Sequence, residues 1–156
     1  MKYLAPACVI LLAGCQHLSY HPPSGDNTAE LTFTSNNTAA QPVVCVPGEG
    51  FESTEYALAQ QPLGGDALND LLETMKKSPE VTTTIAASSQ SRIGVSYNQR
   101  KANGQRDRCK VAVQFESQAG QAYTAHFIYD NDQCGLSLSH ADGSPVDAVR
   151  TDWQCP

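Results

Sequence analysis

The segment Cys109-Lys110-Val111-Ala112-Val113-Gln114-Phe115-Glu116 decides the fold class that this sequence predicts. Cys109, Val111, Val113 and Phe115 fall on one side of an extended chain, and Lys110, Ala112, Gln114 and Glu116 fall on the other. Successive side chains of a β-strand point to opposite faces. The pattern therefore predicts a half-buried strand, with its apolar face toward a core and its more polar face toward water.

Stretches with strand character lie on both sides of this segment. They are residues 31–34, 43–46, 81–86, 93–97, 123–129, 134–138 and 146–151, and turn-forming residues separate them. About eight short strands joined by turns are typical of a sandwich or a barrel. We predict a mainly β domain, an antiparallel β-sandwich of the immunoglobulin-like or transthyretin-like kind.

One amphipathic helix is predicted over residues 66–77, where Asp66 can cap the first turn and Pro79 follows the last. Its apolar stripe, which we expect to pack on a sheet, consists of Leu68, Leu71, Leu72 and Met75. Residues 47–65 are rich in glycine and proline and predict a long loop with at most a short turn near Tyr56. Asp142-Gly143 predicts a type I′ hairpin turn.

The N-terminus combines Lys2, an apolar run over residues 4–12 and the tetrapeptide Leu12-Ala13-Gly14-Cys15. A cation stays in the cytoplasm, a short apolar segment enters the insertion machinery, and small residues give a peptidase access to the bond. This order resembles the signal of bacterial lipoproteins, which implies cleavage before Cys15 and fatty acylation of that cysteine. An ordinary secretory signal and a retained membrane helix are the alternatives. The run is about half of the ~20 residues that a membrane span needs, and Pro6 interrupts it.

The same resemblance implies a location. In lipoproteins of Gram-negative bacteria, Asp after the acylated cysteine favours the inner membrane, and Gln16 stands at that position here. We therefore expect a lipid anchor in the outer membrane and a domain that faces the periplasm. The chain then divides into a signal peptide (1–14), a lipidated flexible tether (15–28) and a disulfide-stabilised β domain (29–156). Removal of residues 1–14 from the 156-residue chain leaves 142 residues, the length of one domain.

Four cysteines remain beyond the expected lipidation site, namely Cys45, Cys109, Cys134 and Cys155. An even number in an oxidising compartment predicts two disulfides. Four cysteines allow three connectivities, and spacing alone does not choose between them. We favour Cys134–Cys155, because a hairpin brings their strands together, and Cys45–Cys109 by elimination. A four-cysteine zinc site is the alternative, but no Cys-x-x-Cys pair is present.

Cations cluster within eleven residues at Arg100, Lys101, Arg106, Arg108 and Lys110. Only one acid, Asp107, opposes them, so the cluster carries +4 while the whole chain carries -6. Asn103-Gly104 predicts a turn that places the cations at the tip and flanks of a hairpin. This hairpin could contact lipid phosphates, lipopolysaccharide or an acidic protein. The alternative is a solvated loop whose charges keep a sheet edge from aggregating.

Residue combinations that carry catalysis or bind cofactors are sparse. The chain has four histidines, of which His126 and His140 are expected to face solvent and the other two lie in the expected tether. It contains no Gly-x-Ser-x-Gly elbow, phosphate-binding loop or dinucleotide fingerprint. Residues 130–132 have carboxylates two apart but depart from a calcium loop, and they predict a turn. We expect no enzyme activity, no metal and no cofactor.

Together these features predict a non-enzymatic binding or structural module of the cell envelope. Its expected partners are the membrane, through the lipid, and an envelope protein or an anionic envelope component. The net negative charge, and the lack of aromatic residues among the clustered cations, argue against a nucleic-acid partner. A periplasmic inhibitor or immunity lipoprotein against a lytic enzyme is one alternative, and an envelope hydrolase is a less favoured one.

Overall fold

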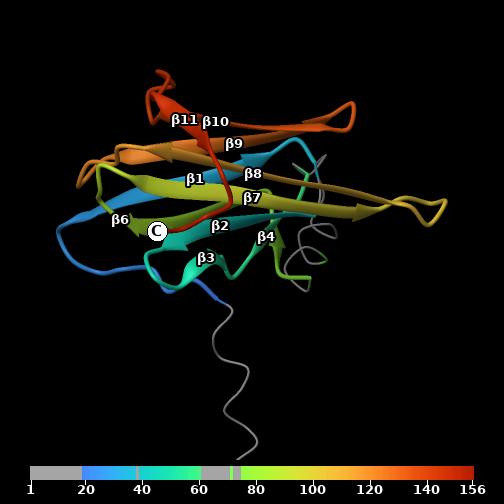
Figure 1. Cartoon of the computed structure of the whole chain (residues 1–156), viewed down its shortest axis with the longest axis horizontal. Helices are drawn as coiled ribbons and strands as arrows, with labels where there is room; N and C mark the ends of the chain where they lie inside the picture. Colours follow the sequence, from blue (N-terminus) through green and yellow to red (C-terminus); the bar gives the residue numbers. More distant parts are fainter. Residues whose placement is uncertain (1–18, 38, 61–70, 72–74) are drawn as a thin grey trace, which may run out of the picture.

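The computed structural model describes residues 19–37, 39–60, 71 and 75–156, and its strands form two facing sheets (Figure 1). The strands are β1 (Thr28–Ser35), β2 (Ala40–Val46), β3 (Gly50–Ser53), β4 (Ala57–Leu58), β5 (Lys77–Ser78), β6 (Glu80–Ala86), β7 (Ser91–Arg100), β8 (Arg106–Phe115), β9 (Ala122–Asp130), β10 (Gln133–His140) and β11 (Ala148–Thr151). The protein is mainly β, as predicted. In this described part of the chain, no helix has the length and apolar character of a membrane span.

The small sheet has the order β10-β9-β1-β6, and the large sheet has the order β11-β8-β7-β2-β4-β5 with β3 paired to β2. Most neighbouring strands are antiparallel, but β1 runs parallel to β9 and β4 runs parallel to β5. Both sheets are therefore mixed, which corrects the predicted antiparallel arrangement. A long connection separates β1 from β9, and only such a connection, not a hairpin, can join parallel neighbours.

One hydrophobic core lies between the two sheets and contains side chains of both. The ring centroids of Tyr97 in β7 and Phe127 in β9 are 5.8 Å apart, and those of Phe115 and Tyr123 are 5.3 Å apart. Val111 and Val113 are buried beside them, while Lys110 is exposed on the other face. The alternation in residues 109–116 therefore marks the inner and outer faces of β8 as predicted.

All eight stretches predicted as strands form strands, and the structure adds two that we expected to be loop. β3 pairs with β2 by placing Phe51 opposite Cys45, and β4 buries Leu58 completely. Gly48 and Gly50, at φ 82° and 107°, turn the chain sharply enough for β3 to return beside β2. The glycines that suggested a loop instead make a tight connection between two strands.

The helix predicted over residues 66–77 is not seen in the described part of this range, apart from a single helical residue, Leu71. Residues 61–70 and 72–74 lie outside them, and so does much of the expected stripe. Met75 N donates to Leu71 O at 3.0 Å, but these two side chains are 54% and 53% exposed and do not pack on a sheet. Lys76 has φ 51° and Lys77 begins β5, so the chain is already extended where we expected the last helical turn.

The turn at Asp142-Gly143 also differs from the prediction. A type I′ turn needs positive φ at both central residues, but only Gly143 has it, at 84°. His140 N donates to Ser144 O at 2.8 Å and Gly143 N donates to His140 O at 2.9 Å, which closes a three-residue loop with a glycine bulge. Asn131-Asp132, at φ 47° and 61°, makes the tight turn between β9 and β10, as expected for residues 130–132.

Two disulfides are present as predicted, but their pairing is Cys45–Cys155 and Cys109–Cys134. Cys109 and Cys134 lie on the inner faces of β8 and β10, so their bond joins the two sheets. Cys45 lies on the outer face of β2, between Val44 and Val46, which pack against the core. The predicted pairs, Cys134–Cys155 and Cys45–Cys109, would each join an inner face to an outer one. The hairpin that we expected to bring Cys134 and Cys155 together extends only as far as the bridge between Ser139 and Pro145, because β10 belongs to the small sheet and β11 to the large one.

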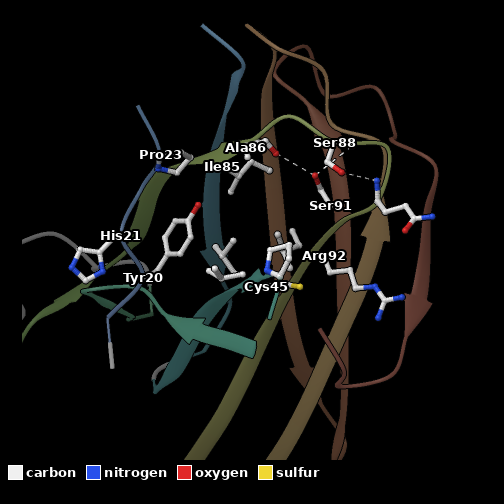
Figure 2. A pocket seen from close by; sticks show the side chains of 14 residues that line it. Tyr20, His21, Pro23, Cys45, Ile85, Ala86, Ser88, Ser91 and Arg92 are labelled. Atoms are coloured by element: carbon white, nitrogen blue, oxygen red, sulfur yellow. Dashed lines mark hydrogen bonds between the residues drawn. The ribbon is translucent and has the colours of Figure 1, made fainter. Parts of the chain in front are cut away.

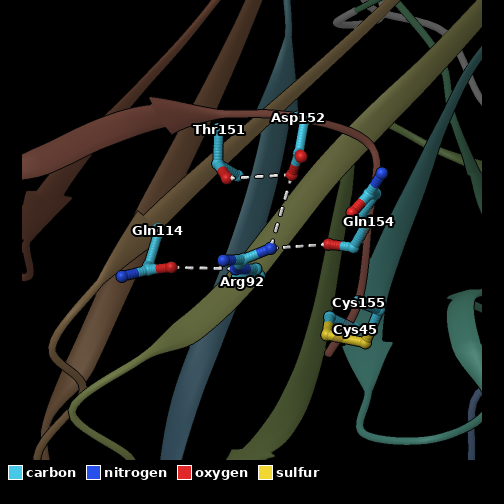
Figure 3. A network of polar contacts seen from close by, with 7 residues as sticks. All are labelled: Cys45, Arg92, Gln114, Thr151, Asp152, Gln154 and Cys155. Carbon is cyan, nitrogen blue, oxygen red and sulfur yellow. Dashed lines mark hydrogen bonds and ion pairs between the residues drawn. A yellow bond between two sulfur atoms is a disulfide. The ribbon is translucent and has the colours of Figure 1, made fainter.

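The last residues of the chain form a strap, residues 152–156, over the outer face of the large sheet (Figure 3). The strap leaves β11 after Thr151 and reaches β2, where Cys155 bonds to Cys45. Arg92 Nη1 donates to Gln154 O at 2.8 Å and pairs with Asp152 at 3.5 Å. The C-terminus is therefore fixed across β7 rather than continuing along β8.

Residues 19–28 contact the domain, whereas we expected little in this part of the tether to pack. Tyr20 is 9% exposed, its amide donates to Ser53 O at 2.7 Å, and its hydroxyl donates to Thr84 O at 2.8 Å. Ser53 belongs to the large sheet and Thr84 to the small one. Burial, followed by the charge of Glu52, raises the pKa of Tyr20 from 10.0 to about 12.

Candidate functional site

The clustered cations lie on the hairpin of β7 and β8, which projects as a long ribbon in Figure 1. Lys101 N donates to Gln105 O at 2.7 Å, and Gly104 N donates to Lys101 O at 3.0 Å. Gly104 has φ 86°, a conformation that favours glycine, and the Asn103 side chain accepts from Gln105 N at 3.0 Å. Asn103-Gly104 therefore lies in the turn of this hairpin, as the sequence predicted.

Strand register separates the cations by face. Directly opposed residues of a ladder share a face, and the pairs toward the tip are Arg100 with Arg106, Asn98 with Arg108, and Ser96 with Lys110. We call the exposed set Arg100, Arg106, Arg108 and Lys110 the basic face. Among the described residues, no carboxylate forms an ion pair with any of the four.

Lys101 was predicted to belong to this site, but its partners lie elsewhere. Its Nζ is 2.7 Å from Asp107 and 3.8 Å from Asp132, and Asp107 faces the opposite side of β8 from Arg106 and Arg108. The hydrogen bond to Asp107 is the main cause of the raised pKa of Lys101. The one acid of the cluster therefore balances Lys101, and the four cations of the basic face have no ion-paired carboxylate in the described part of the chain.

Aromatic side chains cover the inner side of the same hairpin. The rings of Tyr97 and Tyr129 are 4.4 Å apart, and the Tyr97 hydroxyl bonds to Gln99. Burial is the main cause that raises the pKa of both tyrosines, and a hydrogen bond to Asp132 adds to it at Tyr129. Together with the nearby Cys109–Cys134 bond, these contacts connect the hairpin to the small sheet.

Trp153 of the strap lies at one end of the basic face. The sequence analysis did not predict this position. Its ring stacks on Phe51 at 4.7 Å, and Lys110 Nζ lies 5.0 Å from its centroid. The ring also covers Gly94, where an added Cβ would lie 3.0 Å from Trp153 and 2.8 Å from Val111 O. Only glycine therefore fits at position 94, and Lys110 is held against an aromatic ring at one end of the basic face.

A hollow lies where the N-terminal segment meets β6 and β7 (Figure 2). It encloses about 230 Å³ and is lined by Tyr20, Cys45, Ile85 and Arg92 among others. Ser91 Oγ is 2.7 Å from Ser117 Oγ, and it also donates hydrogen bonds to the carbonyl oxygens of Ala86 and Ser88. In the part of the chain described, this serine has no histidine partner that would activate it.

The other polar residues singled out in the sequence form no further site where the structure describes them. His126 Nδ1 is 2.8 Å from Thr34 Oγ1, and the ring of His140 contacts that of Tyr123 at 5.4 Å. Within the described ranges, no group of three histidine, cysteine or acidic side chains could hold a metal ion. The basic face is therefore the feature of this structure that most clearly suggests a ligand, and that ligand would be anionic.

Comparison with known proteins adds no assignment. No protein-family model matches the chain, and a search of curated proteins finds no match.

Proposed function

We propose that this chain is a lipoprotein of the outer membrane, facing the periplasm, whose β domain is a non-enzymatic binding module for an acidic partner. The partner is an envelope protein or another anionic component of the envelope. The basic face binds it, and the domain supplies a rigid support for that face.

The sorting of charge on one hairpin carries this proposal. Asp107 and Lys101 balance each other, while four cations share the opposite face. Arg100 and Arg106 stand directly opposite each other, and like charges in this arrangement destabilise a sheet by roughly 0.2–1 kcal/mol. An acidic partner removes this repulsion, so the arrangement favours the bound state.

The lipid anchor rests on the tetrapeptide Leu12-Ala13-Gly14-Cys15. Tyr20 is fixed to both sheets, so the chain between Cys15 and Tyr20 can separate domain and lipid by at most about 18 Å. The domain then sits close to the membrane surface. Cys15→Ser should abolish acylation and membrane association, which mass spectrometry and cell fractionation measure. Unchanged membrane association would overturn the anchor.

We further propose that the two sheets form a β-sandwich of the immunoglobulin-like or transthyretin-like kind. The shared core, the ring contacts between Tyr97 and Phe127 and the Cys109–Cys134 bond between the sheets support this type. An experimental structure that showed a closed barrel would overturn it.

Charge reversal tests the binding proposal. The triple variant Arg100→Glu, Arg106→Glu, Arg108→Glu should lose chemical cross-linking to the partner in intact cells. The matched control reverses Lys76, Lys77 and Arg150, which changes the net charge equally but lies outside the basic face. Capture that is equal in wild type and triple variant, or lost equally in both variants, would remove the basic face from the function.

An inhibitor of a lytic enzyme is the second candidate, and the projecting hairpin is the observation that favours it. A ribbon with cations on one face fits the carboxylate-lined cleft of a glycoside hydrolase. The purified chain should then slow the clearing of cell-wall suspensions by such enzymes, and the triple reversal should remove the effect. Clearing at an unchanged rate would exclude this candidate for the enzymes assayed.

A further inference from the structure

Part of one edge of β8, beside the basic face, has no partner strand among the residues that the structure describes. β11 pairs with β8 only from Ala112 to Phe115, whereas β7 follows β8 along its whole length from Arg106. In the described part of the chain, no strand therefore pairs with the outer edge of β8 from Arg106 to Val111. We call this stretch the open edge. Unpaired strand edges are templates for the addition of another strand.

The hydrogen-bond pattern identifies which peptide groups face the open edge. Lys101 N donates to Gln105 O, so the pair at positions 101 and 105 is hydrogen-bonded across the hairpin. Hydrogen-bonded and non-hydrogen-bonded pairs alternate along an antiparallel ladder. By this alternation Asp107, Cys109 and Val111 bond to β7. The amides and carbonyls of Arg106, Arg108 and Lys110 then point away from β7, toward the open edge.

A proline on the neighbouring strand supports this assignment. Pro42 of β2 lies opposite Val95, and proline has no amide hydrogen to donate. Val95 must therefore direct its own peptide groups to β8 rather than to β2, as the alternation requires. The three peptide units at the open edge thus belong to the same residues that supply three cations of the basic face.

The strap explains why the C-terminal residues after β11 do not pair with the open edge. After Thr151 it turns over the outer face of the large sheet instead of continuing along β8 (Figure 3). Arg92 and the Cys45–Cys155 bond hold it there. Among the described residues, no strand takes the position next to Arg106, Arg108 and Lys110 in line with β11, where a strand from another molecule could pair.

The charges select the kind of strand. A second copy of this chain that paired edge to edge with β8 would place its own arginines against Arg106 and Arg108, and like charges oppose such pairing. A strand with acidic residues at alternate positions would instead place each acid opposite a cation, since opposed residues share a face. The open edge therefore disfavours self-association and favours an acidic segment.

We infer that an extended acidic peptide segment of the partner adds to the large sheet as a strand, antiparallel to β8 along the open edge. Its alternate acids pair with Arg106, Arg108 and Lys110, and its backbone bonds to the peptide groups of the same three residues. This inference rests on the proposed function and specifies how the basic face would recognise its partner.

A synthetic peptide tests the inference directly. The probe is acetyl-Thr-Glu-Val-Glu-Val-Glu-Thr-amide, added to the full chain in detergent. In the antiparallel arrangement its glutamate amides face β8, and its valine amides face solvent. N-methylation of the three glutamates should weaken binding by roughly tenfold or more, whereas N-methylation of the two valines should leave it nearly unchanged. Isothermal titration calorimetry measures both.

Hydrogen exchange reports the backbone contacts without any substitution. At saturating peptide, the amides of Arg106, Arg108 and Lys110 should exchange roughly tenfold or more slowly than in the free chain. Those of Asp107 and Cys109, already bonded to β7, should change much less. If the peptide bound through side-chain charges alone, exchange at Arg106, Arg108 and Lys110 would not slow more than exchange at Asp107 and Cys109.

A matched pair of variants separates charge from backbone. Arg108→Thr removes a cation and keeps the amide, whereas Arg108→Pro removes both, and the amide that it removes is not used by β7. Proline is tolerated at such edge positions. The proline variant should bind the peptide several-fold more weakly than the threonine variant, with unchanged thermal unfolding as the control for folding.

The outcomes distinguish this inference from the proposed function. Equal binding of both methylated peptides, or no peptide binding while the triple reversal still abolishes partner capture in cells, would overturn strand addition alone. Charge-dependent binding to phosphatidylglycerol vesicles with no binding to the peptide would also overturn it, in favour of lipid. Partner capture that survives the triple reversal would overturn the proposed function itself.

Discussion

The two faces of the β7–β8 hairpin differ in how completely their side chains are paired. On the inner side, Tyr97 is 1% exposed between aromatic rings, Cys109 is bonded to Cys134, and Asp107 pairs with Lys101. On the outer side, four cations share a face with no paired carboxylate among the described residues. The comparison indicates that the inner face contributes to stability, whereas the cations of the outer face are available to the proposed acidic partner.

The effect of alanine substitution on the free energy of unfolding should differ most between Tyr97, on the inner face, and its neighbour Asn98, on the outer face. Tyr97→Ala removes a buried ring next to Phe127 and should lower the free energy of unfolding by about 3–5 kcal/mol. Asn98→Ala, on the outer face, should lower it by less than about 0.5 kcal/mol. Urea denaturation of both variants measures this difference. Similar losses in the two would contradict the assignment of the faces.

Removal of either disulfide should lower the free energy of unfolding by a comparable amount. The double variant Cys109→Ala, Cys134→Ala frees a loop that spans 25 positions and should lower the free energy of unfolding by about 3–4 kcal/mol. The same change at Cys45 and Cys155, 110 positions apart, should lower it by about 5 kcal/mol in the chain-entropy account. Chemical denaturation measures the free energy of unfolding of both double variants. A mixed pairing in the disulfide map of the wild type would contradict the structure.

High pH should weaken the contact that fixes the N-terminal segment. The folded pKa of Tyr20 is raised to about 12 from 10.0, so its neutral form is favoured by folding. That contribution is complete below pH 10 and is lost between pH 10 and 12, by on the order of 1–2 kcal/mol. The advantage of wild type over Tyr20→Phe should therefore shrink across this range in denaturation experiments. A constant difference would show that the Tyr20 hydroxyl is not buried.

Relief of charge repulsion should give the smallest change and the one most specific to the outer face. Arg106→Glu places an acid opposite Arg100 and should raise the free energy of unfolding by about 0.5 kcal/mol, while partner capture falls. Arg150→Glu, on β11 and outside the basic face, is the control. A variant that is both less stable and fully able to capture the partner would contradict a binding role for these cations.

The sequence predicted which residues of strands such as β8 lie on the inner and outer faces, but it did not predict which strands are neighbours. Alternation is local, so the inner face of β8 was evident from Val111, Val113 and Phe115. Disulfide pairing depends on which distant strands and faces meet. The hairpin argument for Cys134–Cys155 was wrong because β10 and β11 lie in different sheets. The parallel pairing of β1 with β9 was missed because it too depends on which distant strands meet.

The sequence likewise predicted some residues of the candidate site but not their tertiary contacts. The cluster of cations and its turn were visible in the sequence, and the period of two could have sorted Asp107 away from Arg106 and Arg108. The partners of Lys101, however, include Asp132 from another hairpin, and Trp153 reaches Lys110 only because the strap crosses the sheet. Such contacts depend on tertiary structure and leave no local signal.

Site-specific photo-cross-linking in cells tests the central claim most directly. A benzophenone amino acid placed at Asn98, on the outer face between the cations, should form an adduct with one partner, and Arg106→Glu in the same chain should remove that adduct. The same amino acid at Ser137, exposed on β10 of the small sheet, should form none. Adducts at Ser137 but not at Asn98, or adducts at Asn98 that persist after the charge reversal, would contradict a binding role for the basic face.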